Sequence, residues 1–321
     1  MKTDEAPTDA DVPAPLPVKS ARQIRWVRRR KALRRFWATY RRNRLGMIGL
    51  VLLIFFVGMA IFSVFADKAQ LQKTNVTAES IAPCTFTTLP CAPNSTHLLG
   101  TDKDGRSVLA LTVEGSRVSL VVGLAASLIT MIVGAAVGII AGFMGRWPDS
   151  ILMRGTDFFL VIPWLPLAIV LAAIFGQNII VLIAIIGFTS WPSTARLVRA
   201  QTLSVREHLY VERSRALGAT NPQIVVRHIL PNVMPVIFAN TILTVAIAIL
   251  SESSLSFLGL GDPRRITWGT MIDAAFDAGA ISIGAWWWLL APSLGIVLVV
   301  LAFTLCGYAL DEIINPRMRD R

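Results

Sequence analysis

The chain of 321 residues is 54% hydrophobic and only 16% charged, with a mean hydropathy of +0.60. These values lie far from those of soluble globular domains and indicate a protein that resides in a bilayer. The net charge of +11 does not indicate nucleic-acid binding, because many of the basic residues lie before residue 45, beside the first apolar run. Basic residues at that place are typical of the positive-inside rule and of contact with anionic lipid headgroups.

The N-terminal region divides into two parts of different composition. Residues 1–21 are rich in Pro, Asp and Ala and have too few apolar side chains to fold, so we expect a disordered cytoplasmic tail. Residues 22–44 predict a basic amphipathic juxtamembrane helix on the inner membrane surface, and a solvated basic arm is the alternative. The apolar side chains recur near helical spacing among many arginines: Trp26, Leu33, Phe36, Trp37 and Tyr40.

Six segments are apolar enough to cross a membrane, which requires about 20 such residues. They are 45–66, 118–144, 158–175, 179–195, 232–252 and 286–310. The third and fourth share one uncharged run that is too long for a single crossing. We expect it to turn at 176–178, because Gly and Asn tolerate left-handed backbone conformations. The sequence thus predicts an all-α polytopic membrane protein with both termini on one side.

The basic residues of the short loops predict the orientation. Those of the N-terminal arm, the turn near residue 150, the loop 196–231 and the tail 311–321 all fall on one face, which is therefore expected to be cytoplasmic. The other face carries the extracytoplasmic loop 67–117 and the outer loop 259–285. Cys84 and Cys91 both lie in the first of these loops, where a short disulfide is plausible; two free thiols are the alternative.

Two features inside the spans suggest packing or transport roles. Gly134, Gly138 and Gly142 are spaced by four and form one small-residue stripe, which predicts a close helix–helix contact. Glu252 stands among serines near the outer end of the fifth span. An ionisable group at that depth faces a cavity or a partner. We therefore expect either a pathway or gate residue, or a structural hydrogen bond to the neighbouring serines.

The loop 196–231 is predicted to form two short helices that meet at a glycine. The first extends to about Ala216, and Gly218 can end it in the left-handed conformation. Asn221 and Pro222 are suited to begin the second as N-cap and first-turn proline, and Pro231 is expected to stop it. Such a projecting turn is suited to lie in a groove of another protein.

The order Glu212, Gly218, Leu230, Pro231 resembles the "EAA" loop of permease subunits of bacterial ABC importers. In that family the loop inserts into a cleft of the ATPase subunit. The two alanines of the pattern are replaced here, and His228 stands at the isoleucine position. The resemblance implies an ATPase-docking segment that comprises Glu212, Arg213, Ser214, Arg215, Ala216, Leu217, Gly218 and Ala219.

Two outer segments narrow the resemblance to the C-type permeases of dipeptide, oligopeptide and nickel importers. The first is 97–109, followed by Gly115 and Arg117, and the second is 254–261, followed by Thr267-Trp268-Gly269. Ser107 and Ser116 depart from the family pattern. The resemblance covers about residues 34–316 and implies the type I ABC importer permease fold, with a five-helix core over 118–310.

The resemblance further implies a permease subunit that moves di- or oligopeptides into the cytoplasm across a bacterial plasma membrane. The implied partners are a second, B-type permease, two ATPases and an extracytoplasmic binding protein. No Gly in the chain is followed by Lys, so the ATP-binding G-x-x-x-x-G-K-[ST] loop is absent, and ATP and Mg²⁺ are expected on the partners. We expect this chain to bind no cofactor or metal and to be no enzyme.

Three alternatives remain at this point. The cargo of a related permease can be nickel or another small solute. An ion-driven secondary transporter would require charged groups in mid-span, and only Glu252 comes near. A membrane enzyme is disfavoured because His97, His208 and His228 are scattered and form no metal-ligand spacing.

Overall fold

The computed structural model describes residues 26, 30–31, 34, 36–65 and 90–314. These residues form helices and turns, with one isolated antiparallel bridge between Thr101 and Ser107. The chain divides into two compact units, Met1–Arg42 and Asn43–Arg321. Cys84 and the tails lie outside the described residues.

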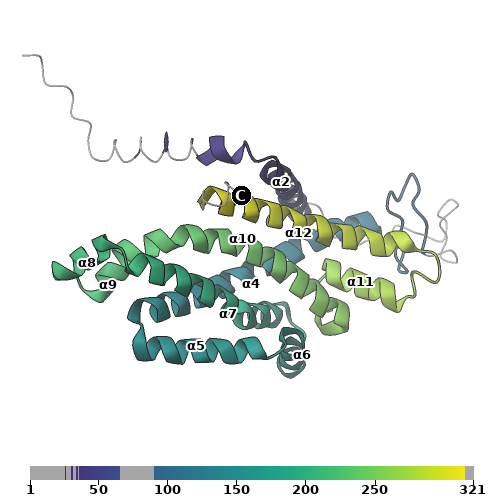
Figure 1. The fold of residues 1–321 in the computed structure, drawn as a ribbon. Coiled ribbons are helices and arrows are strands. Elements are labelled where there is room, and N and C mark those ends of the chain that lie inside the picture. Colours follow the sequence, from purple (N-terminus) through teal and green to yellow (C-terminus); the bar gives the residue numbers. More distant parts are fainter. Residues whose placement is uncertain (1–25, 27–29, 32–33, 35, 66–89, 315–321) are drawn as a thin grey trace, which may run out of the picture. The chain divides into compact units, whose positions relative to one another are not determined.

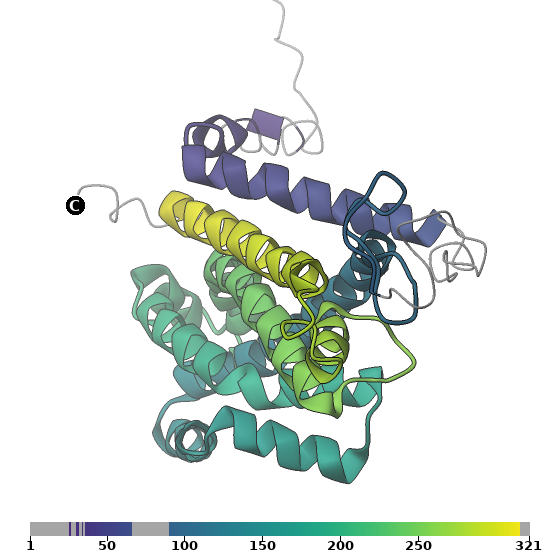
Figure 2. The same ribbon diagram turned by 90° about the vertical axis from the view of Figure 1, so that its right-hand side faces the viewer.

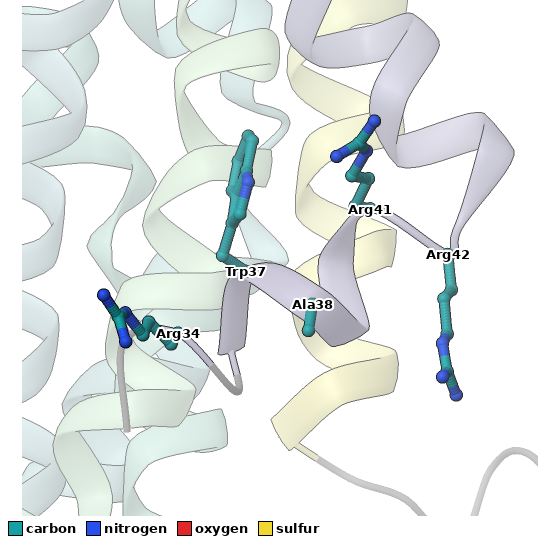
Figure 3. A pocket seen from close by; sticks show the side chains of 5 residues that line it. All are labelled: Arg34, Trp37, Ala38, Arg41 and Arg42. Atoms are coloured by element: carbon teal, nitrogen blue, oxygen red, sulfur yellow. The ribbon is translucent and has the colours of Figure 1, made fainter. Parts of the chain in front are cut away.

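In the first unit, the described residues between 26 and 40 are helical. Aromatic side chains pack on one another, with Phe36 and Trp37 each 6.1 Å from Tyr40 between ring centroids. Arg34, Trp37, Ala38, Arg41 and Arg42 line a pocket, and Figure 3 shows Trp37 and Arg41 extending to one side while Arg42 extends to the other. The placement of this segment on a membrane surface stays a prediction.

The second unit is built from the helices drawn in Figure 1. In chain order they are α2 (Arg44–Phe65), α4 (Val108–Met144), α5 (Arg146–Val161), α6 (Trp164–Phe175), α7 (Ile179–Arg206), α8 (Leu209–Ala216), α9 (Asn221–Ile224), a π-helical turn (Val225–Ile229), α10 (Leu230–Leu255), a second π-helical turn (Ser256–Leu260), α11 (Trp268–Asp277) and α12 (Trp286–Ile314). Within the described ranges, five helical segments are long and apolar enough to span a membrane. A sixth span results if α5 and α6 are counted as one.

The third predicted span, 158–175, is not a single helix. Helix α5 ends at Val161, α6 begins at Trp164, and the two are bent by 88°. Pro163 explains the break, because a proline disfavours helical conformation of the residue before it, and Ile162 is extended. The predicted turn after α6 is confirmed: Gly176 ends that helix with a φ of 89°.

Other boundaries also differ from the prediction. Helix α4 begins at Val108 rather than near 118, because Ser107 caps it and the polar residues up to Arg117 form its first turns. Helix α7 continues beyond 195 to Arg206, so its last turns are polar. The outer loop 259–285 contains a helix that was not predicted, α11, which Thr267 caps.

Helices α4 and α7 run parallel and approach each other closely along the small-residue stripe. A Cβ atom built on Gly134 would lie 2.7 Å from Cβ of Thr194, and one on Gly142 would lie 2.8 Å from Cβ of Thr202. One on Gly138 would lie 2.6 Å from the carbonyl oxygen of Ala195. Side chains larger than hydrogen therefore do not fit at these three positions without a shift of one helix.

Helices α2 and α12 lie side by side, on the side of the unit opposite α5 (Figures 1 and 2). The amide of Asn43 donates to the carboxylate of Glu312 at 2.6 Å and joins their ends. The largest buried cluster surrounds Trp268 of α11, where α2, α4, α10 and α12 meet. A separate cluster packs α4 and α7 against α8, α9, the first π-helical turn and the start of α10. Figure 1 shows α8 and α9 at the end of this unit that lies opposite α11.

Candidate functional site

The loop between α7 and α10 forms an elbow, defined here as residues 208–232. Its first arm, α8, ends in a Schellman motif: Gly218 has a φ of 82°, its N–H donates to Arg215 O, and the N–H of Ala219 donates to Ser214 O, each at 3.0 Å. The predicted left-handed glycine is therefore confirmed. The second arm, α9, begins with Pro222 in its first turn, and Thr220 N–H donates to Gln223 Oε1 at 3.0 Å.

Apolar side chains anchor the elbow to the helices that carry it. Val211 of α8, Ile224 of α9 and Ile229 of the π-helical turn are each at most 1% exposed. They belong to the buried cluster that also contains Ile139 of α4 and Val198 of α7. Buried apolar contacts therefore hold the elbow against the ends of α4 and α7, in addition to the chain connection from α7.

The remaining predicted docking residues lie on the outside of the elbow. Glu212, Arg213 and Arg215 are exposed, and so are Ala216 and Gly218. Leu217 is 89% exposed, although leucine is among the residue types most often buried. Only Ser214 and Ala219 of the segment are partly buried. The structure thus brings the eight residues together as one projecting surface.

A small polar cluster fixes the two arms to each other. Ser214 Oγ lies 3.1 Å from His228 Nε2 and also donates to Tyr210 O at 2.9 Å. The rings of Tyr210 and His228 are 5.9 Å apart between centroids. His208 and His228 thus both lie in the elbow, although their separation along the sequence gave no indication that they belong to one structural element.

Pro231 does not stop the second arm, contrary to the prediction. The helix continues through Pro231 into α10, because the π-helical turn shifts the hydrogen-bond register immediately before it. Leu230 N–H donates to Val225 O, five residues back. The side-chain amide of Asn232 donates to His228 O at 2.6 Å and satisfies that carbonyl.

Two arginines of α7 join the elbow's supporting helix to its neighbours. Arg199 makes a two-point contact with the carboxylate of Asp149 in α5, with one nitrogen–oxygen distance of 2.7 Å. Arg206 donates to the carbonyl oxygens of Gly142 and Phe143, at 3.0 and 3.4 Å. These contacts fix the turn between α4 and α5 to the end of α7 that leads into α8.

Glu252 lies far from the elbow, at the α11 end of α10. Its side chain is fully buried and accepts hydrogen bonds from Ser119 at 3.2 Å, Ser256 at 2.8 Å and Ser253 at 3.4 Å. The backbone N–H of Trp268 donates to Ser119 in turn, at 3.3 Å. This arrangement is the one expected if Glu252 has a structural role as a hydrogen-bond partner of the neighbouring serines. A role of Glu252 in transport stays a prediction.

The cysteines are only partly described. Cys91 is buried, while Cys84 lies outside the described residues, so their pairing stays a prediction. Cys306 is buried within α12. Among the described residues, no group of three or more His, Cys, Asp or Glu side chains could hold a metal ion.

Comparison with known proteins assigns the family. The family model described as "Binding-protein-dependent transport system inner membrane component" matches residues 134–320, more than half of the chain. The chain belongs to this family. It is therefore a multi-pass inner-membrane permease subunit of an importer, and not the ATPase of that importer. The resemblance deduced from the sequence motifs is confirmed.

A second model, "N-terminal TM domain of oligopeptide transport permease C", matches residues 31–83. The dipeptide transport system permease protein DppC of Bacillus subtilis is 34% identical over 88% of this chain and 85% of its own length. OppC, the oligopeptide transport system permease protein of the same organism, is 32% identical over 87% of this chain and 88% of its own length. A putative peptide permease protein of Brucella suis is 38% identical over 70% of this chain and 75% of its own length.

Among solved structures, a chain of the inward-facing MetNI methionine ABC transporter matches with a TM-score of 0.52 and 20% identity. The match covers 64% of this chain and 95% of that chain. At this level of identity the similarity shows a shared fold, which is that of ABC importer permeases.

Sequence reasoning missed the contacts that connect the elbow to its surroundings. Asp149 and Arg199 are 50 residues apart in the chain, and Ser214 and His228 are 14 apart. No spacing rule along one helix identifies such pairs. A turn proline such as Pro222 shows where an arm begins, but not what its side chains contact.

Proposed function

We propose that this chain is the C-type permease of an ABC importer for di- or oligopeptides, and that its elbow docks on an ATPase subunit. The elbow carries the proposal: eight consecutive residues form one projecting surface with Leu217 at 89% exposure, held by buried anchors at the end of the unit opposite α11. An ordered projecting surface that combines an exposed leucine with charged side chains is suited to contact a partner protein.

The basic residues of the elbow support a cytoplasmic location, as the positive-inside rule requires. Arg213, Arg215 and Arg227 all lie in it and are exposed. The cytoplasm is where an ATPase is found. In this proposal, the opposite end, with α11, faces the binding protein that delivers the cargo. The cargo class is inferred from relatives that are named dipeptide and oligopeptide permeases.

The mechanism that we propose is alternating access. Closure of the two ATPases around ATP draws the elbows of the two permeases together, and this opens the path outward; hydrolysis resets the inward-open state. ATP can drive the change only if the elbow binds differently in the two states. The anchors at Val211 and Ile224, and the contacts of Arg199 and Arg206, would transmit that motion to α4, α5 and α7 as one packed body.

Charge reversal in the elbow tests the docking role. Glu212→Arg should abolish peptide uptake and weaken co-purification of the ATPases, while the permease still inserts in the membrane. Asp277→Arg is the matched control, because Asp277 is an exposed acidic residue of α11 at the other end of the unit. It should leave ATPase co-purification unchanged. Wild-type uptake by Glu212→Arg would refute the docking role.

A further inference from the structure

A cavity of about 370 Å³ lies where the break between α5 and α6 meets α7 and α10. Seven of its lining side chains have hydrogen-bonding groups: Trp164, Thr189, Ser190, Ser193, Thr194, Asn240 and Thr244. The rest of the lining is mostly apolar. Among the described residues that line the cavity, none has a charged side chain. It is a neutral polar cavity, distinct from both the elbow and the Glu252 cluster.

The depth of this cavity in the membrane is the first indication of a function. Asn240 and Thr244 lie midway along α10, which is long enough to span the membrane, whereas Ser193 lies near the end of the apolar part of α7. Polar groups at mid-depth are costly against lipid and are found where they face a partner, a cavity or a transport path. A second cavity, of about 420 Å³ between α2, α4 and α12, is lined by apolar and tryptophan side chains apart from Thr112.

The broken helix is the second indication. Ile162 and Pro163 interrupt helical structure between α5 and α6 and line the cavity themselves. Backbone that is not helical is tolerated at membrane depth only where protein buries it or where it lines a cavity. Interrupted helices near the midplane form substrate sites in other classes of transporter.

The polar groups of the lining are partly used and partly available. Trp164 Nε1 donates to Thr189 Oγ1 at 3.0 Å, and Asn240 Nδ2 donates to Thr194 Oγ1 at 3.1 Å. These bonds fix the positions of the Trp164 ring and of the Asn240 side-chain amide. Within the described part of the chain, the hydroxyls of Ser190 and Ser193 make no hydrogen bond, so a cargo can use them.

We propose that this cavity is this chain's half of the transport path and that it binds the backbone of a peptide in transit. The inference rests on the proposed function and deepens it. Hydroxyl and amide groups match the N–H and C=O groups that every peptide bond presents. A charge-free lining gives no preference for acidic or basic side chains. It also offers no carboxylate or imidazole to a bare divalent cation, so the chemistry favours peptide over nickel ion as cargo.

Removal of hydroxyl groups tests the proposal. The test variant combines Ser190→Ala, Ser193→Ala and Thr244→Val, which delete three lining hydroxyls with little change of shape. The matched control combines Thr241→Val, Ser254→Ala and Ser293→Ala, which remove hydroxyls of α10 and α12 that do not line the cavity. Each donates to a carbonyl of its own helix, and Thr241 Oγ1 also lies 2.6 Å from Met131 Sδ of α4. Thr241 and Thr244 are three residues apart on α10, and of the two only Thr244 lines the cavity.

Both variants are assayed as complete complexes, with ATPases, second permease and binding protein, in proteoliposomes loaded with ATP. Uptake of a labelled tripeptide should fall at least about tenfold in the test variant, since each lost hydrogen bond costs roughly two- to tenfold. Uptake by the control should stay within about twofold of wild type. Wild-type uptake by the test variant, or an equal loss in the control, would overturn the proposal.

A labelling experiment reads occupancy of the cavity directly. Ser193→Cys should react with N-ethylmaleimide, and a transported peptide should slow that reaction severalfold during turnover. Ser254→Cys, exposed near the α11 end of α10, should show no such protection. Equal protection of both positions, or of neither, would overturn the proposal. If the wild-type complex transports no peptide, the proposed function is refuted. If it transports peptide and the cavity variants transport peptide as well as the wild type does, only the proposed role of the cavity is refuted.

Discussion

Ser214 and His228 meet across the elbow, with Oγ and Nε2 separated by 3.1 Å. The contact joins α8 to the π-helical turn that precedes α10, so the two arms of the elbow are held to each other as well as to the core. A docking element that must transmit force benefits from such internal bonds, because a loose elbow would absorb the motion of its partner.

Loss of the Ser214 hydroxyl should loosen the elbow without unfolding the protein. Ser214→Ala removes the contact with His228 and should cost about 1 kcal/mol of local stability, typical of one hydrogen bond. Amide hydrogen exchange within residues 209–219 of the detergent-solubilised complex should then speed up roughly fivefold. Ser204→Ala is the control, because Ser204 is exposed on α7. Unchanged exchange in Ser214→Ala would show that the cluster does not stiffen the elbow.

Gly218 should tolerate no other residue at low cost, although space is available. No atom lies within 4 Å of a Cβ built there, but the φ of 82° disfavours any L side chain. Gly218→Ala should therefore destabilise the elbow by about 1 kcal/mol. Gly155→Ala is a matched control, since Gly155 also faces open space but lies inside α5, where alanine is favoured by about 1 kcal/mol. Thermal unfolding of the two variants should shift in opposite directions.

The contact between α4 and α7 should be sensitive to a single methyl group. Gly138→Ala would place Cβ 2.6 Å from the carbonyl oxygen of Ala195, so one helix must move. We expect a loss of about 1–3 kcal/mol in stability and a marked loss of uptake. Gly58→Ala in α2, where no atom lies within 4 Å, should have neither effect. Normal uptake and stability of Gly138→Ala would show that close approach of these helices is dispensable.

The outer segment after α10 should lose order in acid. Burial raises the pKa of Asp262, but hydrogen bonds from the Arg264 side chain and from the backbone of Arg264 and Ile179 outweigh it, so its pKa is lowered overall. A lowered carboxylate pKa stabilises the fold above the unfolded pKa of about 4, and this stability is lost as pH falls through the folded value.

The protection of residues 261–267 against hydrogen exchange, corrected for the intrinsic pH dependence of exchange, should accordingly fall below about pH 4 in the wild type. Asp262→Asn should exchange faster at neutral pH and show a weaker dependence on pH. Because Arg264 is 74% exposed, the pair itself contributes little energy, and the effect should stay local. If the protection of this segment in the wild type stayed constant down to acid pH, the result would contradict this account.

The sequence predicted those parts of the fold that depend only on residues close together in the chain. Gly218 and Pro222 predicted both arms of the elbow, since a left-handed glycine and a first-turn proline need no distant contact. The prediction that Pro231 stops the second arm was wrong, because the π-helical turn and the Asn232 side chain compensate for the hydrogen bond that this proline cannot make. Contacts between segments could not be predicted: the glycine stripe indicated a close helix but not that α7 is its neighbour. The cavity was not predicted either, because Ser193 and Asn240 line one space only in the folded chain.

The account depends most on where the tip of the elbow lies and on what covers it. Leu217→Cys places a thiol at the most exposed apolar position of the elbow. A membrane-impermeant maleimide should label it in inside-out vesicles stripped of ATPases, and not in right-side-out vesicles; rebinding of the ATPases should block the labelling. Labelling from the outer side, or labelling that bound ATPases leave unchanged, would contradict the account.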